Sequence, residues 1–315
     1  MILVTGGTGF VGSHLIRRLH AEGQDVRVLL RPSEQSPALP KGVPVDVAIS
    51  SLHDERGMRA ALVGVKAIYH LVGVNWLENR LDWFETEVEG TRELLAVAKD
   101  AGVRRIIFLS HLDADRASAF SLLKAKAIVE EDIRASGLDY TIIRSSLAYG
   151  PRDNFTVPIT KLLRLAPWVF PFPGDGNSLT QPIWIEDLVS CLAWSLDNEG
   201  LLNQLIEIGG PEHLTIRDIL TQISAATGKR RYLSFVRPSY FRLLANGFRF
   251  IFPRMPLSNV WGDYLSNNHV TSLDGITKTF GLLPSRFSHR LDYLKPKKPA
   301  ISMVQRFTTR FSKDG

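Results

Sequence analysis

A glycine-rich turn at the start of the chain limits the possible folds more than any other feature. The apolar run Ile2–Thr5 leads directly into residues 6–12, Gly-Gly-Thr-Gly-Phe-Val-Gly, and apolar residues at helical spacing follow. In such a strand–turn–helix unit, Gly6 permits a sharp turn, Gly9 lets a pyrophosphate approach the backbone, and Gly12 lets the helix pack against the strand. The helix N-terminus supplies N–H groups and partial positive charge for phosphates. The turn therefore predicts a dinucleotide site, to which we expect the following residues to contribute: Gly6, Thr8, Gly9, Phe10, Val11 and Gly12.

Strand-like apolar runs alternate with helical periods over the first half of the chain. We expect strands at residues 2–5, 26–30, 43–49, 67–72, 105–109 and 140–144. We expect helices at residues 10–21, 55–63, 82–101 and 121–136. Because strand–helix–strand crossovers are right-handed, this order predicts an α/β fold with a Rossmann-type, doubly wound parallel sheet. Two later runs, at 181–185 and 205–208, are expected to return to the sheet.

The pattern also predicts a division of the chain. We assign residues 1–154 to a Rossmann domain that is completed by about 179–210. Residues 155–178 and 211–294 are aromatic and rich in arginine, and we expect them to form a smaller, mainly helical C-terminal lobe over the cofactor. Residues 295–315 form a basic tail.

Composition excludes several classes of function. Cys191 is the only cysteine, so neither an intramolecular disulfide nor a cysteine metal cluster can form, and the eight histidines lack metal-ligand spacing. The formal charge is +6, but the basic residues concentrate after residue 229 without a nucleic-acid reading motif, so we expect no nucleic acid. No apolar run is long and uncharged enough to span a bilayer, and no leader precedes the first strand, which favours a cytoplasmic protein.

Several short motifs together resemble the atypical and extended short-chain dehydrogenase/reductase family. The similarity covers about residues 1–294, and the motifs fall in family order at residues 5–12, 70–73, 89–91, 149–151, 181–187 and 209–215. Within the family, Gly174-Asp175-Gly176 and residues 209–212 resemble the NDUFA9-like branch, named for the NADPH-binding accessory subunit of respiratory complex I. The resemblance implies a Rossmann fold and a bound nicotinamide dinucleotide.

The end of the second strand bears on the choice of cofactor. NAD enzymes place a carboxylate there for the ribose hydroxyls, whereas Arg31 occupies it in this chain and suits the 2′-phosphate of NADP(H). The other reading of Arg31 is a solvated surface arginine. Ser51 stands where family members have an acid that bonds the adenine amine. Val72, Gly73 and Asn75 follow the fourth strand, and the resemblance places them along the middle of the cofactor.

The chain departs from the family in the catalytic motif. Family dehydrogenases carry Tyr-x-x-x-Lys on one helix face, where the lysine holds the nicotinamide ribose and lowers the pKa of the tyrosine. Counting back four residues from Lys126 gives Leu122, and counting back from Lys124 gives Phe120. Neither side chain can transfer a proton. Lys126 is the better match because of its distance to Gly137.

Two further positions near the predicted nicotinamide site are candidates. Ser110 falls in the family's serine segment, and His111 follows it, either as a proton donor or as a polar loop residue. Tyr149 follows the sixth strand, and we expect it to form part of the nicotinamide wall. The candidate catalytic residues are therefore Lys126, Ser110 and His111.

Two hypotheses follow, because carbonyl reduction needs a group that protonates or stabilises the developing alkoxide. The first is an accessory or assembly factor of a membrane redox complex that holds NADP(H). The second is an NADPH-dependent reductase or epimerase-like enzyme in which Lys126 works without the tyrosine. Residues 239–255 and the tail combine bulky apolar and basic side chains, which suits peripheral attachment to an anionic membrane surface or a membrane-bound complex. The alternatives are a buried lobe helix and a solvated tail, and the sequence does not indicate an oligomeric state.

Overall fold

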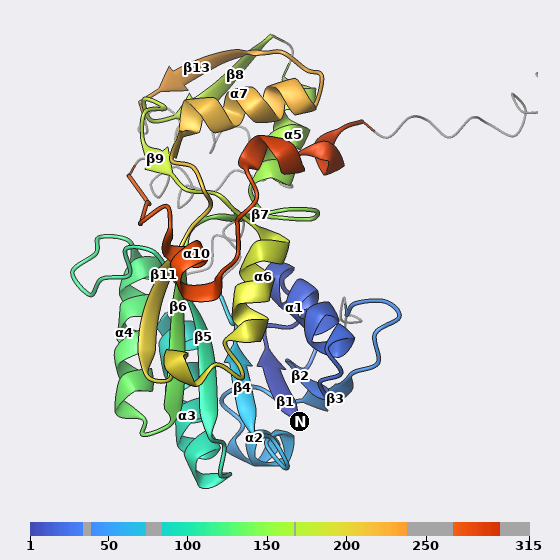
Figure 1. The fold of residues 1–315 in the computed structure, drawn as a ribbon, viewed down its shortest axis with the longest axis vertical. Coiled ribbons are helices and arrows are strands. Elements are labelled where there is room, and N and C mark those ends of the chain that lie inside the picture. Colours follow the sequence, from blue (N-terminus) through green and yellow to red (C-terminus); the bar gives the residue numbers. More distant parts are fainter. Residues whose placement is uncertain (34–38, 74–83, 167, 238–266, 297–315) are drawn as a thin grey trace, which may run out of the picture.

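The central element is a seven-stranded parallel sheet in the order β11-β6-β5-β4-β1-β2-β3 (Figure 1). It belongs to a computed structural model that describes residues 1–33, 39–73, 84–166, 168–237 and 267–296. The strands are β1 (Ile2–Thr5), β2 (Val26–Leu30), β3 (Asp46–Ile49), β4 (Ala67–His70), β5 (Arg105–His111), β6 (Asp139–Ser145) and β11 (Gln204–Ile208). The predicted Rossmann-type fold is confirmed. The chain order reverses between β1 and β4, which is where α/β sheets of this kind bind ligands.

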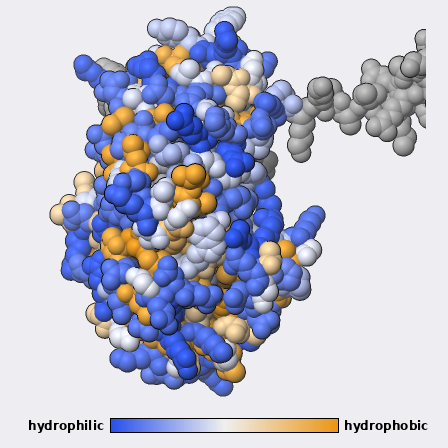
Figure 2. Space-filling model, viewed as in Figure 1, coloured by the Kyte–Doolittle hydropathy of each residue, from blue (hydrophilic) through white to orange (hydrophobic). Residues whose placement is uncertain are grey.

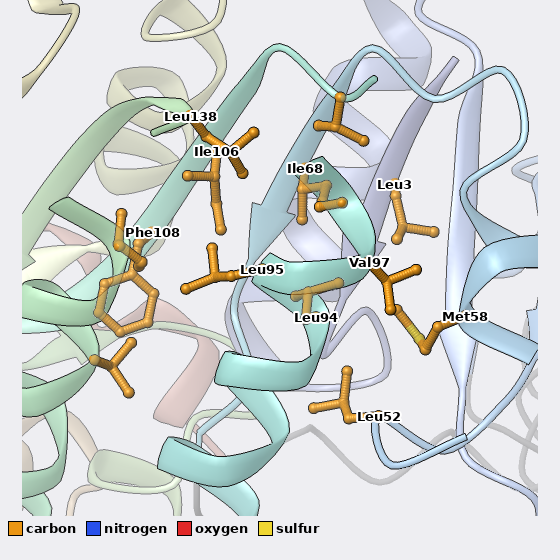
Figure 3. Close-up of a cluster of buried hydrophobic side chains, with 14 of the residues drawn as sticks. Leu3, Leu52, Met58, Ile68, Leu94, Leu95, Val97, Ile106, Phe108 and Leu138 are labelled. Carbon is orange, nitrogen blue, oxygen red and sulfur yellow. The ribbon is translucent and has the colours of Figure 1, made fainter. Parts of the chain in front are cut away.

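Helices cover both faces of the sheet. Helices α1 (Phe10–Ala21) and α6 (Ile185–Trp194) pack together on one face, where Cys191 is a buried core residue and burial raises the pKa of its thiol to about 12. Helices α2 (Glu55–Ala61), α3 (Gly90–Asp100) and α4 (Ser121–Ala135) cover the other face. Figure 3 shows how side chains of α3 pack against those of β1, β4 and β5. These two layers of apolar contact fix the strand ends that form the site.

A π-helical turn, η1 (Glu85–Glu89), precedes α3. The sequence predicts a continuous α-helix over 82–101, whose first two residues lie outside the described part of the chain. The wider turn brings Glu87 and Val88 into the interior. Gly90 then lies against Leu52, where a Cβ would approach the leucine side chain to 2.9 Å. The periodicity of the segment could not indicate the change of helix type, because α- and π-turns differ by one residue.

The expected return of residues 181–185 to the large sheet is wrong. Only β10 (Ile183–Trp184) forms there, and it pairs with β7 (Ala148–Tyr149), whereas residues 204–208 do return as β11. The preceding Pro182 has no N–H to contribute to a ladder, which restricts strand formation at this point. Gln181 instead bonds through its backbone and side chain to Gly210.

A second group of elements lies beyond the carboxyl ends of the sheet strands and has its own core (Figure 1). It contains α5 (Thr156–Leu165), β8 (Val169–Pro173), β9 (Leu179–Thr180), β12 (Leu214–Thr215), α7 (Ile216–Ala226), β13 (Tyr232–Val236), η3 (Phe287–Arg290) and η4 (Asp292–Leu294). Strands β8 and β13 pair in parallel. These strands were not predicted from the sequence, because β8 contains two prolines and no clear alternation of polar and apolar residues. Two short elements, η2 (Glu199–Leu201) and α10 (Gly275–Phe280), complete the described structure.

The surface of the molecule is mostly hydrophilic in the view of Figure 2, with apolar residues in scattered groups. Among the described helices, none is long and apolar enough to cross a membrane. The basic segment 239–255 and all but the first two residues of the tail 295–315 lie outside the described residues.

Candidate functional site

The glycine turn after β1 has the geometry that phosphate binding requires. Gly6 has a φ of +72°, which favours glycine, and its carbonyl accepts from the Gly9 N–H at 3.0 Å. A Cβ on Gly12 would overlap the carbonyl oxygen of Gly6, so this position needs glycine for the close approach of α1. The first turn of α1 has no side-chain cap and no acidic residue. Its N–H groups are therefore available to an anion.

A cavity of about 420 Å³ opens beside this turn, at the carboxyl ends of β1, β4, β5 and β6. Of the residues predicted to bind a nucleotide, its wall includes Gly6, Thr8, Gly9, Phe10, Val11, Gly12, Val72, Gly73, Ser110 and Lys126. The glycine turn and the polar residues thus border one continuous space. An uncapped helix start at one end and hydrogen-bonding side chains at the other fit an elongated dinucleotide.

Lys126 is the lysine that borders the cavity, whereas Lys124 points to solvent on the same helix. The Lys126 Nζ atom lies 2.8 Å from Glu87 Oε2 and donates to the Val72 carbonyl oxygen at 3.0 Å. Both charged side chains are buried, at 3% and 0% exposed for Lys126 and Glu87. Leu122, one turn before Lys126, lines the same cavity. An aliphatic side chain therefore forms the cavity wall four residues before Lys126.

Ser110 also borders the cavity, but its hydroxyl forms a hydrogen bond to a buried residue outside the cavity wall. It donates to Glu130 Oε1 at 2.6 Å, and the Glu130 carboxylate is buried. Arg144 holds the same carboxylate with two hydrogen bonds of 2.8 and 2.9 Å. Because its one proton is committed to Glu130, Ser110 offers lone pairs to a ligand and cannot donate to a carbonyl oxygen.

His111, at the end of β5, lines the cavity next to Ser110. Burial, together with the charges of Lys126 and His269, lowers the pKa of this imidazole from 6.5 to about 3. The ring is therefore neutral near pH 7, and an imidazolium is not available there as a general acid.

Tyr149 does not border the cavity. Its ring is buried between Trp184 and Phe287, at 5.4 and 4.7 Å between centroids, and its hydroxyl donates to the Arg286 carbonyl oxygen. Burial raises the pKa of the phenol. Tyr149 thus packs in the core of the second group of elements, behind the wall on which the sequence analysis placed it.

The residues predicted for the adenosine end lie apart from this cavity. Arg31 directly follows β2, is exposed, and pairs with no carboxylate among the residues that the structure describes. Ser51 follows β3, and its hydroxyl accepts from the His53 N–H at 3.3 Å. Asn75, which was predicted for the middle of the cofactor, lies outside the described residues.

Sequence reasoning missed several residues of the site. Glu87 and Glu130 are the carboxylates that contact Lys126 and Ser110. The other polar wall residues that were not predicted are Ser13, Ser145, Ser146, Arg152 and Asn154. Glu130 is four residues after Lys126, a spacing that places both on one helix face, so this carboxylate could have been found. Glu87 reaches the interior through the π-helical turn, which gives no comparable signal.

Known proteins are similar to this chain in sequence and in fold. A family profile described as NAD(P)H-binding matches residues 6–156. The sterol demethylase protein B of Methylococcus capsulatus is 30% identical over 256 residues, which are 73% of this chain and 75% of that protein. The chain belongs to the NAD(P)H-binding, atypical and extended short-chain dehydrogenase/reductase family. The resemblance predicted from its motifs is confirmed.

Two further relatives bear on the branch and the fold. A mitochondrial NADH dehydrogenase [ubiquinone] 1 alpha subcomplex subunit 9 of Arabidopsis thaliana is 27% identical over 223 residues, 69% of this chain but only 55% of that protein. The structure of an Escherichia coli NADPH-dependent quinone oxidoreductase complexed with NADPH has a TM-score of 0.75, 19% identity, and covers 93% of this chain and 99% of that one. The second likeness shows the shared fold.

Proposed function

We propose that the protein binds NADP(H) in this cavity and holds it without reducing a carbonyl, as an accessory or assembly factor of a membrane redox complex. Leu122 carries the proposal, because it occupies the cavity wall one helical turn before Lys126, where the family's phenol would transfer a proton. A leucine can pack against a nicotinamide ring but cannot supply a proton. Bound NADPH would bring a transferable hydride. This wall, however, supplies no acid that could protonate the oxygen of a carbonyl substrate.

Lys126 and Ser110, the two candidate catalytic residues that match the family motifs, support a role in holding the nucleotide. Glu87 compensates the charge of Lys126, so the ammonium presents less net positive charge to a developing oxyanion. The Ser110 hydroxyl donates its hydrogen bond to Glu130, and neutral His111 supplies no imidazolium. These side chains can still bind ribose hydroxyls and a carboxamide, for which hydrogen-bond acceptors are useful.

Arg31 supports NADP(H) over NAD(H). The guanidinium follows β2 without a carboxylate partner among the described residues, so it is available for a charge-assisted contact with a 2′-phosphate. The likeness to a subunit named for the NADH dehydrogenase subcomplex supports the accessory role, and we propose a peripheral location at the membrane.

A comparison of binding with turnover tests this function. We expect calorimetry to show tight NADPH binding, and the bound NADPH to remain unoxidised with quinones, enones and sugar nucleotides. Lys126→Met should weaken NADPH binding through the lost ribose contact while no turnover changes. Steady NADPH oxidation by the wild-type protein that disappears in Lys126→Met would overturn the proposal.

That contrary result would establish the second candidate, an NADPH-dependent reductase or epimerase-like enzyme. One observation favours it: Lys126 borders the cavity beside Gly73, where a Cβ would lie 4.0 Å from the lysine Nζ. An ammonium in this place can stabilise an oxyanion even without a phenol. The discriminating quantity is kcat, which must fall in Lys126→Met beyond the loss in NADPH affinity.

A further inference from the structure

Strands β8 and β13 lie at the end of the molecule that is farthest from the parallel sheet (Figure 1), and a group of large side chains is exposed there. Trp168 is 81% exposed, Tyr232 73%, Leu165 70% and Val169 47%. Leu165 ends α5, Trp168 directly precedes β8, and Val169 and Tyr232 begin β8 and β13. We call these four residues the lobe-tip surface.

The backbone holds these residues close to one another. Tyr232 and Val169 are register partners at the start of the parallel β13–β8 pair, and the Tyr232 N–H donates to the Trp168 carbonyl oxygen at 2.9 Å. The Arg231 Nε donates to the Ala166 carbonyl oxygen at 2.7 Å, which ties the end of α5 to the approach to β13. The aromatic side chains thus project from a hydrogen-bonded scaffold.

The chain segments that carry this surface are purely basic. Residues 156–173 and 219–237 contain no Asp or Glu, and their basic residues are Lys161, Arg164, Lys229, Arg230, Arg231 and Arg237. Helices α5 and α7 pack against η4, whose Asp292 forms an ion pair with Lys295. The carboxylate of Asp218, at the start of α7, accepts from the Thr215 hydroxyl at 2.6 Å in the helix cap. The protruding aromatic residues therefore stand beside basic residues, with no free carboxylate among the described residues of α5, β8, β13, α7 and η4.

We propose that the lobe-tip surface docks on an anionic lipid headgroup layer. Tryptophan and tyrosine favour the membrane–water boundary because one part of each ring system is apolar and another part is polar. Arginine and lysine beside them attract anionic lipids and keep their charges in the headgroup region. This inference rests on the proposed accessory role and names the surface that would contact the membrane. It does not depend on whether the protein holds NADP(H) without turnover.

Co-sedimentation of the full chain with lipid vesicles tests the proposal. We expect binding to vesicles of phosphatidylcholine mixed with phosphatidylglycerol, and little binding to pure phosphatidylcholine. Lys229→Gln/Arg230→Gln should weaken binding by roughly 25-fold, at about fivefold for each basic residue near an anionic surface. Trp168→Ser and Tyr232→Ser should each weaken binding at least severalfold. The basic tail is unchanged in all these variants, so the differences report the lobe tip.

Two matched controls keep the experiment specific. Ile49→Ser removes an exposed apolar side chain, 69% exposed, from β3, and Arg104→Gln removes an exposed charge just before β5. Both should bind vesicles as the wild-type chain does. Brominated lipids should quench the wild-type fluorescence more than that of Trp168→Phe, which shows that this ring enters the boundary.

The outcomes separate this inference from the proposed function. Equal vesicle binding by wild type and all lobe-tip variants would overturn lipid docking, whatever NADPH calorimetry shows. Loss of membrane attachment in cells with no vesicle binding by the pure protein would also overturn it, in favour of a protein partner. Weakened vesicle binding with unchanged NADPH affinity supports it, and NADPH turnover would contradict only the nucleotide-holding role.

Discussion

The Nζ atom of Lys126 lies 2.8 Å from Oε2 of Glu87, and the two oppositely charged side chains are buried together at the wall of the nucleotide cavity. No hydrogen-bond donor other than this ammonium compensates the Glu87 carboxylate among the described residues. Removal of one partner from such a pair is costlier than removal of both. The pair therefore constrains both the stability of the domain and the chemistry of the site.

We expect Lys126→Met to lower the free energy of unfolding by about 3–5 kcal/mol, because it leaves Glu87 buried and uncompensated. The double variant Lys126→Met/Glu87→Met should regain most of this loss. Urea denaturation of the wild type, both single variants and the double variant gives the coupling energy. Strictly additive losses would show that the two side chains do not stabilise each other.

Arg31→Ala should weaken NADPH binding by about 1.5–3 kcal/mol, the contribution of one hydrogen bond to a charged group. NADH lacks the 2′-phosphate, so its affinity should change little. Calorimetry with both nucleotides checks the difference, and Arg104→Ala, near the opposite ends of the strands, is the control for general loss of charge. Equal losses for NADPH and NADH would remove the basis for the NADP assignment.

Two glycines of the nucleotide turn should respond differently to the same substitution. Gly9 has a φ of −71°, and its only close Cβ contact would be Gly6 O at 3.1 Å, so Gly9→Val should fold and fail to bind NADPH. A side chain on Gly12 would overlap the backbone of Gly6, so Gly12→Val should destabilise the protein itself. Thermal unfolding and calorimetry separate the two effects. Unchanged NADPH affinity in Gly9→Val would contradict the expected approach of the pyrophosphate.

The strands and helices of the Rossmann part could be predicted because each rests on a local pattern. The expected bounds of β1, β2 and α1 equal the observed ones. Gly102 and Gly137, which follow α3 and α4, have the positive φ that is typical of residues after a helix end. The β8–β13 pair could not be predicted, because its partners are far apart in sequence and prolines interrupt β8.

The residues of the candidate site could be predicted only where the residue type and its spacing along the chain were sufficient to indicate a role. The glycine turn, Lys126 and Leu122 follow from spacing along the chain, and the structure brings them to one cavity. Glu87 depends on a helix type that sequence periodicity does not reveal, and its contact with Lys126 joins two separate helical segments. Long-range electrostatic contacts of this kind need the tertiary structure.

Leu122→Tyr should introduce a phenol at the cavity wall, one turn before Lys126. If only the acid is missing, this variant should gain NADPH-dependent reduction of quinones or aldehydes above the wild-type background, by on the order of 100-fold for one general acid. Leu122→Phe is the matched control, because it adds the ring without the hydroxyl. Equal rates in the two variants would show that another residue limits the reaction instead. The candidates are Lys126, whose charge is compensated by Glu87, and Ser110, whose hydroxyl donates to Glu130.

The stability of the nucleotide domain should depend on pH through His70, which is buried behind the glycine turn. Its Nδ1 lies 2.8 Å from Thr5 Oγ1 and its Nε2 lies 2.9 Å from Thr91 Oγ1. Burial, together with the charge of Lys126, lowers the pKa of His70 from 6.5 to about 3. The unfolded chain then binds more protons than the folded one in this window, so the stability contribution is present above about pH 6.5 and is lost as pH falls towards 3.

His70→Gln should reduce this dependence, because glutamine retains hydrogen-bonding groups but does not titrate. His111 has its pKa lowered in the same direction, so a smaller slope remains. Urea midpoints between pH 7 and pH 4 measure the slope, and His20→Gln, at an exposed ring on α1, is the control. Because the unfolded protein gains a proton at His70 only in the wild type, identical slopes for wild type and His70→Gln would mean that His70 does not stay neutral in the folded protein.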